Sequence, residues 1–364
     1  MRILNASELD VAAQLLREGQ LVAIPTETVY GLGANALDPE AVRNIYLAKG
    51  RPSDNPLIIH VPGREEALRY TRDVPETALM LMERFWPGPL TIVLKRNERI
   101  PDCITAGMET VAVRCPRTPV TLELLRMLDF PVAAPSANTS GRPSTTTVAH
   151  VVEDLEGRIP AVLDGGDCEY GLESTIIDLS EEVPALLRPG AVTLEELREV
   201  LGEVRVDPAV TRLLRPEEKP KAPGMKYRHY APKAPLTMVR GEPDRSAAWI
   251  LERIREEAAD AAGADSADTA GAMDAAGAAA PETIGVLCFD EYLETFAAEP
   301  GVTAESYGSC LDRKEQGHEL FDRLRGFDHA SVRRIYAQCL DDDGIGLAIV
   351  NRLSKAAGFD IKNV

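Results

Sequence analysis

Short apolar runs alternate with amphipathic segments along the first 205 residues of the chain. The runs are rich in Val, Ile and Leu and are bounded by Pro, Gly, Asn or Asp, which is typical of β-strands. They read "LVAIP", "LIIHV", "LTIVL", "VAVRC", "VAAP", "AVLD", "STIIDL" and "ALLRP". Between them, "SELDVAAQLLREG" opens on a Ser N-cap, and "TLEELREVLG" carries a capping box of Thr193 and Glu196. The pattern predicts a mixed α/β domain over residues 1–205.

Periodicity is lost between residues 206 and 233, where prolines are frequent. Such a stretch is typical of a linker rather than of a helix or strand. A plain linker is rarely aromatic, however, and here "KYRHY" places Tyr227 and Tyr230 among basic side chains. We therefore expect this part of the linker to dock on another part of the molecule.

From residue 234 onward, strand-like and helix-like patterns alternate regularly. "PLTMVR", "TIGVLCF" and "VRRIYAQCL" have strand patterns, and each is followed by an amphipathic segment. This alternation predicts βαβ crossovers and a smaller, Rossmann-like parallel-sheet domain over residues 234–364. Residues 258–280 interrupt it with 13 alanines in 23 positions, so we expect a flexible low-complexity insertion there.

Composition narrows the class of protein. A chain of 364 residues that is 45% hydrophobic favours two globular domains. No apolar run is long enough to span a bilayer, and the first residues lack the plan of a signal peptide, so a soluble, cytoplasmic protein is expected. The six cysteines form no C-x-x-C pair, which suggests neither a zinc site nor a disulfide framework.

The charge distribution points to a small anion as ligand. A net charge of −18 argues against stable, sequence-independent binding of nucleic acid. Four segments depart from this acidity, because together they hold eight Lys or Arg and one acid. They read "YLAKGRPSDNP", "VAVRCPRTP", "SANTSGRPSTTT" and "PGMKYRHYAPK". Acid-poor basic segments in so acidic a chain favour an anion-binding site.

The stretch "IPTETVYGLGANA" fits the G-x-G-x-x-A pattern of a dinucleotide site, but its surroundings do not. Five residues separate Gly31 from the predicted strand, and Lys49 and Arg51 stand where the ribose-binding acid is needed. We therefore reject an NAD site and interpret Gly31 and Gly33 as a turn beside a substrate pocket. The sequence also lacks the P-loop, G-x-S-x-G and H-E-x-x-H motifs.

Seven segments in the first domain and one in the linker resemble the threonylcarbamoyl-AMP synthase family, whose catalytic unit is the YrdC-like domain. The segments are "PTETVYGLG", "KGRPSDNPLIIH", "WPGPLT", "TVAVRCP", "APSANTSGRPS", "ESTI", "LLRPG" and "PGMKYRHYAP". With the following domain ending in "GIGLAIVNRLSKAA", the chain resembles the longer, two-domain form. The resemblance implies a mixed, twisted sheet in the first domain and covers nearly the whole chain except the alanine-rich insertion.

The resemblance implies a nucleotidyltransferase that converts L-threonine, bicarbonate or CO2, and ATP to L-threonylcarbamoyl-AMP and pyrophosphate. Other proteins would use the product to build threonylcarbamoyladenosine in tRNA. A carbamate is itself an oxygen nucleophile, so positioning and charge stabilisation by Lys, Arg and hydroxyl groups suffice. Mg²⁺ would sit mainly on phosphate oxygens and water rather than on protein ligands.

The resemblance also assigns site residues position by position. The positions that match threonine contacts are Thr28, His60, Arg114, Ala134 and Ser174. Those that match ATP contacts are Arg51, Asn55, Thr110, Ser136, Asn138, Ser144, Arg188 and a linker tyrosine, either Tyr227 or Tyr230. Lys49 and Arg51 are the expected catalytic charges. Taken one at a time, His60 also fits a core histidine, and Thr28 and Ser174 also fit turn caps.

Two alternatives and one hypothesis remain open at this point. The alternatives are a carbamoyl-adenylate-forming enzyme, which would normally carry zinc-finger-like Cys motifs, and an RNA-binding or ribosome-associated module. The hypothesis is that "KYRHY" folds over the nucleotide site as a lid and protects the labile product from water. Substrate selectivity, oligomeric state and the role of the second domain are not determined by the sequence.

Overall fold

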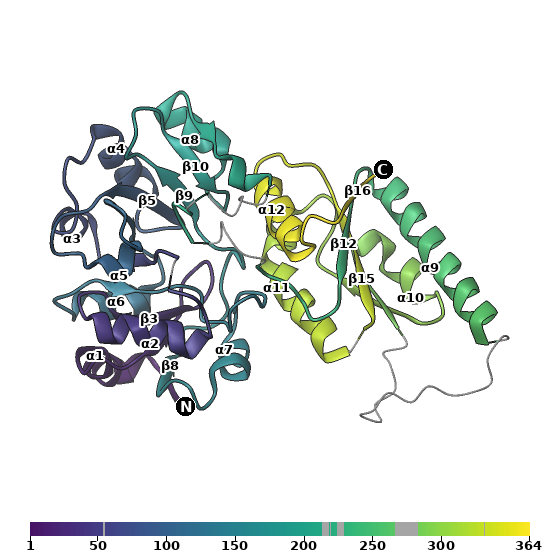
Figure 1. Cartoon of the computed structure of the whole chain (residues 1–364), viewed down its shortest axis with the longest axis horizontal. Helices are drawn as coiled ribbons and strands as arrows, with labels where there is room; N and C mark the ends of the chain where they lie inside the picture. The colour runs from purple at the N-terminus through teal and green to yellow at the C-terminus, as the bar shows by residue number, and fades with distance from the viewer. Residues whose placement is uncertain (54, 213–217, 219, 224–228, 266–282, 331) are drawn as a thin grey trace. The chain divides into compact units, whose positions relative to one another are not determined.

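A computed structural model describes residues 1–364 except 54, 213–217, 219, 224–228, 266–282 and 331. The chain divides into two compact units, Met1–His229 and Tyr230–Val364 (Figure 1). The alanine-rich insertion that we expected at residues 258–280 and most of "KYRHY" fall largely outside the described residues.

The first unit is built on one mixed sheet of eleven strands, in the order β1-β8-β2-β3-β7-β4-β6-β5-β9-β10-β11. The strands are β1 (Arg2–Leu4), β2 (Val22–Ile24), β3 (Gly31–Asn35), β4 (Ile58–His60), β5 (Leu90–Lys95), β6 (Thr110–Arg114), β7 (Val132–Ala133), β8 (Ala161–Leu163), β9 (Thr175–Asp178), β10 (Ala185–Arg188) and β11 (Arg205–Val206). Parallel and antiparallel pairs are both present, so the predicted mixed α/β fold is confirmed. Eight of these strands coincide with the eight apolar runs of the sequence.

Helices surround this sheet. They are α1 (Leu9–Arg17), α2 (Pro39–Lys49), α3 (Arg64–Leu68), α4 (Glu76–Phe85), α5 (Asp102–Thr105), α6 (Pro119–Arg126), α7 (Val148–Leu155) and α8 (Leu194–Leu201), with 3₁₀ turns at Ala6–Glu8 and Pro208–Val210. The capping box predicted from the sequence forms at α8, because Thr193 accepts from the Glu196 amide and Glu196 accepts from the Thr193 amide. Local sequence signals therefore fix where this helix begins.

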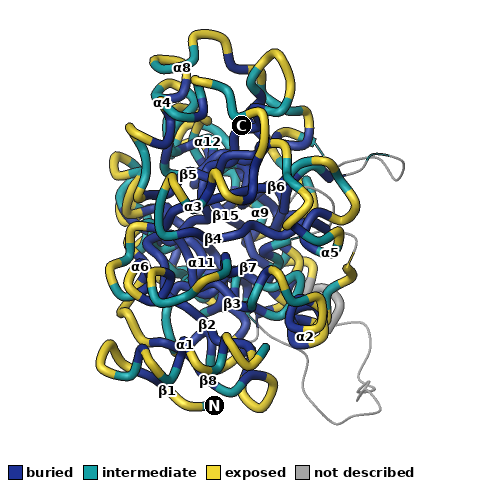
Figure 2. Tube along the Cα trace, turned by 90° about the vertical axis from the view of Figure 1, so that its left-hand side faces the viewer, coloured by how far each residue is buried: buried dark blue, intermediate teal, exposed yellow. Residues whose placement is uncertain are grey.

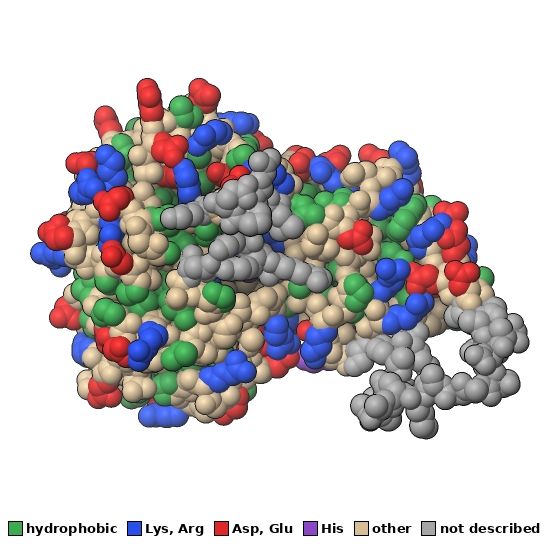
Figure 3. Space-filling model, viewed as in Figure 1, with side chains coloured by type: hydrophobic (Ala, Val, Ile, Leu, Met, Phe, Trp, Pro, Cys, Tyr) green, Lys and Arg blue, Asp and Glu red, His purple; other side chains and the backbone are tan. Residues whose placement is uncertain are grey.

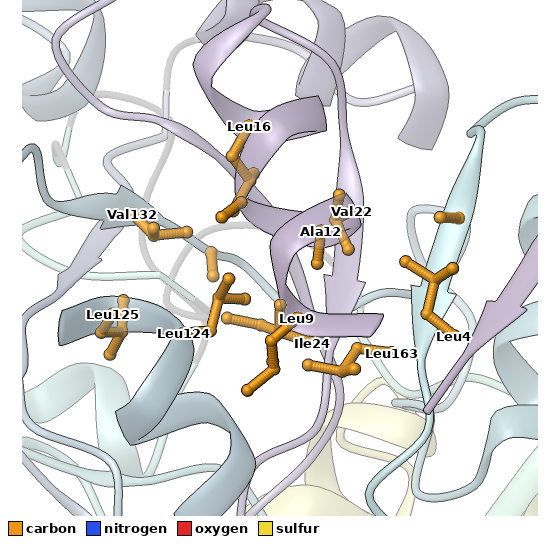
Figure 4. Packing of buried hydrophobic residues seen from close by; sticks show 13 residues of the cluster. Leu4, Leu9, Ala12, Leu16, Val22, Ile24, Leu124, Leu125, Val132 and Leu163 are labelled. Carbon is orange, nitrogen blue, oxygen red and sulfur yellow. The ribbon is translucent and has the colours of Figure 1, made fainter. Parts of the chain in front are cut away.

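One hydrophobic core cluster of the first unit lies where α1 and α6 meet the sheet. Leu9, Ala12 and Leu16 follow one another on one face of α1 at helical spacing and are buried. Figure 4 shows them beside Ile24 of β2 and Leu124 of α6. Complete burial of a leucine side chain contributes about 1.5–3 kcal/mol. The strands β2, β3, β4 and β7 are buried along most of their length, as their dark blue tube in Figure 2 shows. These four strands therefore form the buried centre of the first unit.

The interpretation of Gly31 and Gly33 as a turn was wrong. Both lie in strand β3, which pairs antiparallel with β2 and β7. A Cβ at Gly33 would lie 2.9 Å from the Val22 carbonyl oxygen, and one at Gly31 would lie 3.0 Å from the Ala134 Cβ. The glycines thus allow close approach of neighbouring strands rather than a change of direction. The turn itself is the preceding loop, residues 25–30.

The second unit is a five-stranded, entirely parallel sheet in the order β14-β13-β15-β12-β16. Its elements are β12 (Leu236–Arg240), α9 (Pro243–Asp265), β13 (Ile284–Cys288), a 3₁₀ turn (Asp290–Tyr292), α10 (Leu293–Ala297), β14 (Val302–Ser306), α11 (Arg313–Ala330), β15 (Arg334–Cys339), α12 (Gly346–Ala356) and β16 (Ile361–Asn363). The predicted Rossmann-like parallel sheet is confirmed. Among the described residues, no helix is long and apolar enough to cross a membrane.

Candidate active site

The loop between β2 and β3 forms the centre of the site. Thr26 holds it in shape: its Oγ1 accepts from the backbone amides of Thr28 and Val29, both at 3.2 Å, and donates to the Val29 carbonyl at 2.6 Å. The Oγ1 atoms of Thr26 and Thr28 lie 2.8 Å apart. Both threonines are buried. A buried loop with its polar groups satisfied in this way is rigid.

A buried ion pair anchors this loop to the sheet. Arg114, the last residue of β6, donates from Nη2 to Oε1 of Glu27 at 2.7 Å, and the two side chains are only 4% and 3% exposed. Its Nη1 donates to Thr28 Oγ1 at 2.8 Å and its Nε to the Gly88 carbonyl at 3.3 Å. The second carboxylate oxygen of Glu27 accepts from the Arg117 amide at 2.8 Å. The site thus contains an arginine whose direction is fixed on three sides.

The ionisation of Glu27 follows from these contacts. Burial alone would raise the pKa of this carboxyl, but the charge of Arg114 and its hydrogen bonds outweigh burial and hold the pKa below its ordinary value. Glu27 therefore carries a negative charge at neutral pH. It is the counter-charge that allows the Arg114 guanidinium to be buried.

His60, Arg114 and Thr91 form a row across three neighbouring strands. Arg114 is the register partner of His60 on β4 and of Thr91 on β5, so the three side chains lie on one face of the sheet. Burial, reinforced by the positive charge of Arg114, lowers the pKa of His60 to about 3. Its buried Nδ1 has no hydrogen-bond partner within the described residues. His60 is therefore a neutral imidazole with one nitrogen available to a ligand.

Ser174 lies at the end of this row. Its Oγ is 2.7 Å from Thr91 Oγ1 and accepts from Nη2 of Arg188 at 3.1 Å. Arg188 also donates from Nε to the Ser174 carbonyl at 3.0 Å and from Nη1 to the Pro223 carbonyl at 3.5 Å. Arg188 thus connects a residue predicted to contact threonine with Pro223 of the linker.

Lys49 lies in a second group, around the "PSAN" turn. It ends helix α2, and Gly50 follows in the left-handed conformation with φ 61°, which turns the chain out of the helix. The ammonium group of Lys49 is buried and donates to the carbonyl oxygens of Ser136 and Asn138, the latter at 2.6 Å. Ser136 in turn donates to Asn138 Oδ1 at 2.5 Å. The structure thus brings Lys49, Ser136 and Asn138 together.

The backbone joins these two groups into one site. The amide of Tyr30 donates to the Thr145 carbonyl at 2.8 Å, and the amide of Ala137 donates to the Tyr30 carbonyl at 2.8 Å. Gly31 and Ser136 form an isolated β-bridge. The loop that holds Thr28 therefore lies directly beside the turn that holds Lys49.

The remaining predicted positions of the first unit surround these groups. Asn55 is completely buried, and neither side-chain amide atom has a hydrogen-bond partner within the described residues, so the side chain is free to bind a ligand. Ser144 is buried and donates to Glu173, the neighbour of Ser174 in the chain. Ala134 packs against Gly31, while Thr110 and Arg51 are partly exposed. Thr110 begins β6, where it pairs with Lys95 of β5, and within the described residues the Asn55 side chain makes no hydrogen bond to another predicted site residue.

Of the two linker tyrosines, only Tyr230 lies within the described residues. Tyr227 lies outside the described residues. Tyr230 belongs to the second unit, where it is buried, with its ring stacked on Phe321 at 5.1 Å and Arg352 5.4 Å from the ring centroid. Three of the five residues of "KYRHY", 226–228, lie outside the described residues, so the lid hypothesis stays a prediction.

Sequence reasoning missed two residues of the site, Glu27 and Thr91. Both lie in segments that had been singled out, "TET" and "WPGPLT", but neither was given a role. The signal for Glu27 was available, because a buried arginine needs a counter-charge and "TET" contains the one acid next to Thr28. Thr91 gave no such signal, since its role depends on strand register.

Two buried carboxylates of the first unit are already bound by other protein groups. Glu27 is bound by Arg114 and Arg117, and Asp154 accepts from Arg142 and from the Thr139 amide. In the part of the chain that the structure describes, no group of three or more His, Cys, Asp or Glu side chains is arranged to hold a metal ion. The chemistry of the described site is that of cations, hydroxyls and amides.

Two family models together match nearly the whole chain. Residues 14–190 match the Sua5/YciO/YrdC model, whose description is "Telomere recombination". Residues 192–358 match the model described as "Threonylcarbamoyl-AMP synthase, C-terminal domain". The two matches divide the chain in the same order as its two structural units.

Full-length relatives and solved structures agree with these models. A threonylcarbamoyl-AMP synthase of Pyrococcus abyssi is 45% identical, with 98% of this chain and 96% of the relative covered. One of Bacillus subtilis is 42% identical, with 97% and 94% covered. Among solved structures, P. abyssi Sua5 complexed with L-threonine is similar with a TM-score of 0.88 at 42% identity, and both chains are covered completely.

Proposed function

The chain belongs to the threonylcarbamoyl-AMP synthase family, and from this premise we propose that it makes L-threonylcarbamoyl-AMP and pyrophosphate from L-threonine, bicarbonate or CO2, and ATP. It is accordingly an enzyme of the nucleotidyltransferase type, and its product serves tRNA modification.

The two alternatives raised by the sequence are set aside. On the face seen in Figure 3, acidic side chains stand among the basic ones over the first unit, which does not favour an RNA-binding surface.

The observation that carries the proposal is the row of His60, Arg114 and Thr91 with Ser174 at its end. An amino acid needs a cation for its carboxylate and polar groups for its remaining atoms. Arg114 supplies the cation, held in place by Glu27, and the neutral His60 and the hydroxyls of Thr28 and Ser174 supply donors and acceptors. We assign L-threonine to this row, with Ala134 beside it.

The chemical steps need no protein nucleophile. The amino group of threonine attacks the carbon of CO2 and loses a proton, which gives a carbamate. A carbamate oxygen then attacks the α-phosphorus of ATP, and the bond to the bridging oxygen breaks, so that pyrophosphate leaves. Both partners in the second step are anions, so the protein must lower their repulsion and align them. Preorganised cations and hydroxyls do both.

We assign the nucleotide to the second group of residues. The ammonium of Lys49 lies at the "PSAN" turn with Ser136 and Asn138, next to the threonine row, and is fixed by carbonyl oxygens. Lys49 and Arg51 supply the positive charge that stabilises the triphosphate and the developing charge on the leaving pyrophosphate. Asn55, Thr110, Ser144 and Arg188 complete the ATP contacts, together with Tyr227 or Tyr230.

Mg²⁺ would enter with ATP. The buried carboxylate of Glu27 is already bound by Arg114 and by the Arg117 amide, so the described residues suit a metal that is held mainly by phosphate oxygens and water. When bound, it would neutralise phosphate charge. The protein's own part is to hold the phosphates and exclude water.

The product is a mixed anhydride that must reach a second enzyme before water destroys it. We propose that it passes to the tRNA threonylcarbamoyl transferase machinery, in the cytoplasm where ATP and tRNA are available. The lid hypothesis for "KYRHY" belongs to this part of the proposal. Deletion of residues 222–232 should shorten the lifetime of the adenylate, and an unchanged lifetime and turnover would rule the lid out.

The decisive experiment follows pyrophosphate release by the pure chain with ATP, Mg²⁺ and bicarbonate. Release should require L-threonine and should be weaker with L-serine and L-valine. Identification of threonylcarbamoyl-AMP by mass spectrometry completes the test. Pyrophosphate release that does not depend on threonine would contradict the proposed function.

A further inference from the structure

Ser174 has a hydrogen-bond arrangement that decides what its hydroxyl can offer a ligand. Its oxygen can accept two hydrogen bonds and donate one. Arg188 fills one acceptor position, since a guanidinium can only donate. The bond to Thr91 at 2.7 Å can run in either direction. The direction of that bond therefore decides whether the proton of Ser174 is available.

Thr91 is suited to act as the donor. It is completely buried in strand β5, and within the described residues Ser174 is the one hydrogen-bond partner of its hydroxyl. No other acceptor competes for its proton. If Thr91 donates, both acceptor positions of Ser174 are filled, and the Ser174 proton is left to point at a ligand.

The register of the sheet indicates which chemical group of a ligand would lie at Ser174. Thr91 is the direct partner of Arg114, so Ser174 lies next to the arginine that carries the positive charge of the site. An oxyanion bound to Arg114 would accept the Ser174 proton and thereby favour Thr91 as donor. The same Ser174 is tied to Arg188 by two hydrogen bonds, at 3.1 and 3.0 Å.

We propose that Thr91 is a positioning residue that, with Arg188, commits the Ser174 hydroxyl to donate to an oxyanion of the amino-acid substrate, its carboxylate or its carbamate. Thr91 does not touch the substrate and acts through Ser174. The proposal rests on the proposed function, because it takes an amino acid to be the ligand of this row. It adds a residue to the site that the sequence did not indicate.

The test uses the full chain and three substitutions. Thr91→Val removes the hydroxyl and keeps the shape, and Thr91→Ser keeps the hydroxyl. Thr105→Val is the matched control, because Thr105 is also completely buried in the first unit and its hydroxyl has no hydrogen-bond partner within the described residues. Calorimetry measures the Kd of L-threonine, and pyrophosphate release gives KM and kcat.

Thr91→Val should raise the Kd and KM for threonine about tenfold, the loss expected for one buried hydrogen bond to a charged group. The KM for ATP should change less than twofold. Thr91→Ser should restore threonine binding to within about threefold of the wild type, and Thr105→Val should leave it unchanged. Equal losses in Thr91→Val and Thr91→Ser would assign Thr91 to packing alone and overturn the proposal.

A double-substitution cycle separates this role from a general loss of structure. In a Ser174→Ala background the hydroxyl that Thr91 positions is gone, so Thr91→Val should add less than about a twofold effect. A full tenfold effect in that background would overturn the proposal, even if the variant is less stable. If the wild type binds threonine but releases no pyrophosphate, the proposed function fails while the binding data still decide the role of Thr91. A wild type that binds no threonine overturns both.

Discussion

Glu27 and Arg114 lie 2.7 Å apart in an ion pair that is almost wholly buried, and Arg114 reaches from Glu27 to Thr28 with two different nitrogens. The pair joins the loop after β2 to the end of β6, 87 residues away in the sequence. Burying two charges is costly, and it is tolerated when each charge is paired and fully hydrogen-bonded. The pair fixes the direction of the guanidinium before any substrate arrives, which is what a preorganised anion site requires.

Removing the carboxylate should therefore affect stability and threonine binding together. Glu27→Ala leaves Arg114 buried without its counter-charge, which should lower the free energy of unfolding by about 3–5 kcal/mol. Glu27→Gln keeps the shape and should raise the KM for threonine at least tenfold, because the amide NH2 group cannot accept one of the two hydrogen bonds and Arg114 loses its counter-charge. Denaturant unfolding and pyrophosphate release measure the two effects.

Glu169 offers the matched control for this substitution. It pairs with Arg117 on the surface, where both side chains are about half exposed, at 46% and 58%. Exposed pairs contribute about 0–1 kcal/mol, so Glu169→Gln should change stability and threonine KM little. Equal effects of Glu27→Gln and Glu169→Gln would refute the assigned role of Glu27.

His60 should stay neutral throughout the physiological range. Burial and the neighbouring Arg114 lower its pKa to about 3, against an ordinary value of 6.5. In NMR titrations between pH 5 and 8, the His60 ring signal, identified by its absence in His60→Gln, should not shift. A His60 signal that titrates near pH 6.5 would contradict the neutral donor and acceptor role assigned to it.

The same pKa has a consequence for stability. Between pH 6.5 and about 3 the unfolded chain binds a proton at His60 that the folded chain does not, so this residue makes stability fall as the pH falls. Glu27 acts in the same direction, because its lowered pKa contributes stability above the ordinary pKa of 4.5 that is lost as the pH falls through the folded value. His60→Gln should flatten the decline of stability between pH 6.5 and 4. An unchanged slope would show that His60 is not the residue responsible.

The limits of the sequence are clearest at "IPTETVYGLGANA". The apolar run before it predicted β2 correctly. Thr28 was singled out because the segment resembles a family motif, and its contact with threonine stays a prediction. The strand β3 was missed, because Gly31 and Gly33 have low strand propensity and resemble turn residues. They are glycines because neighbouring strands approach closely, and that contact involves Val132 and Ala134, which lie about 100 residues away in the chain.

In the site, too, features set by the local sequence could be predicted, whereas those set by strand pairing could not. Eight apolar runs were recognised as strands because the signal for a strand is local. The row of His60, Arg114 and Thr91 was not predictable, because it depends on which strands are neighbours and in which register. Thr91 looked like an ordinary strand residue until its pairing was known. Strand order and register are set by packing of the whole sheet, which no local pattern records.

Gly33 gives a direct test of the close strand approach. Gly33→Ala would place a Cβ 2.9 Å from the Val22 carbonyl oxygen and 3.1 Å from Val132 Cγ1, so either the strands separate or the core shifts. The free energy of unfolding should fall by about 1–3 kcal/mol. Gly63→Ala is the control, because its backbone is extended and its nearest neighbour would be a Glu66 side-chain oxygen at 3.5 Å. If both substitutions are tolerated equally, the steric explanation of Gly33 is wrong.

Substitution of Lys49 distinguishes a catalytic role of its charge from a structural role of its side chain. Its ammonium is buried and bound by the carbonyl oxygens of Ser136 and Asn138, so it shapes the "PSAN" turn as well as supplying charge. Lys49→Arg keeps the charge but cannot fit the same small space, and Lys49→Met keeps most of the volume without the charge. If the charge stabilises the transition state, Lys49→Met should lower kcat about 10²–10³-fold while the Kd of threonine, measured by calorimetry, changes less than threefold. A comparable loss of threonine binding in Lys49→Met would mean that Lys49 acts mainly by holding the turn beside Tyr30 and the threonine row. The positive charge that stabilises the phosphates would then come from Arg51.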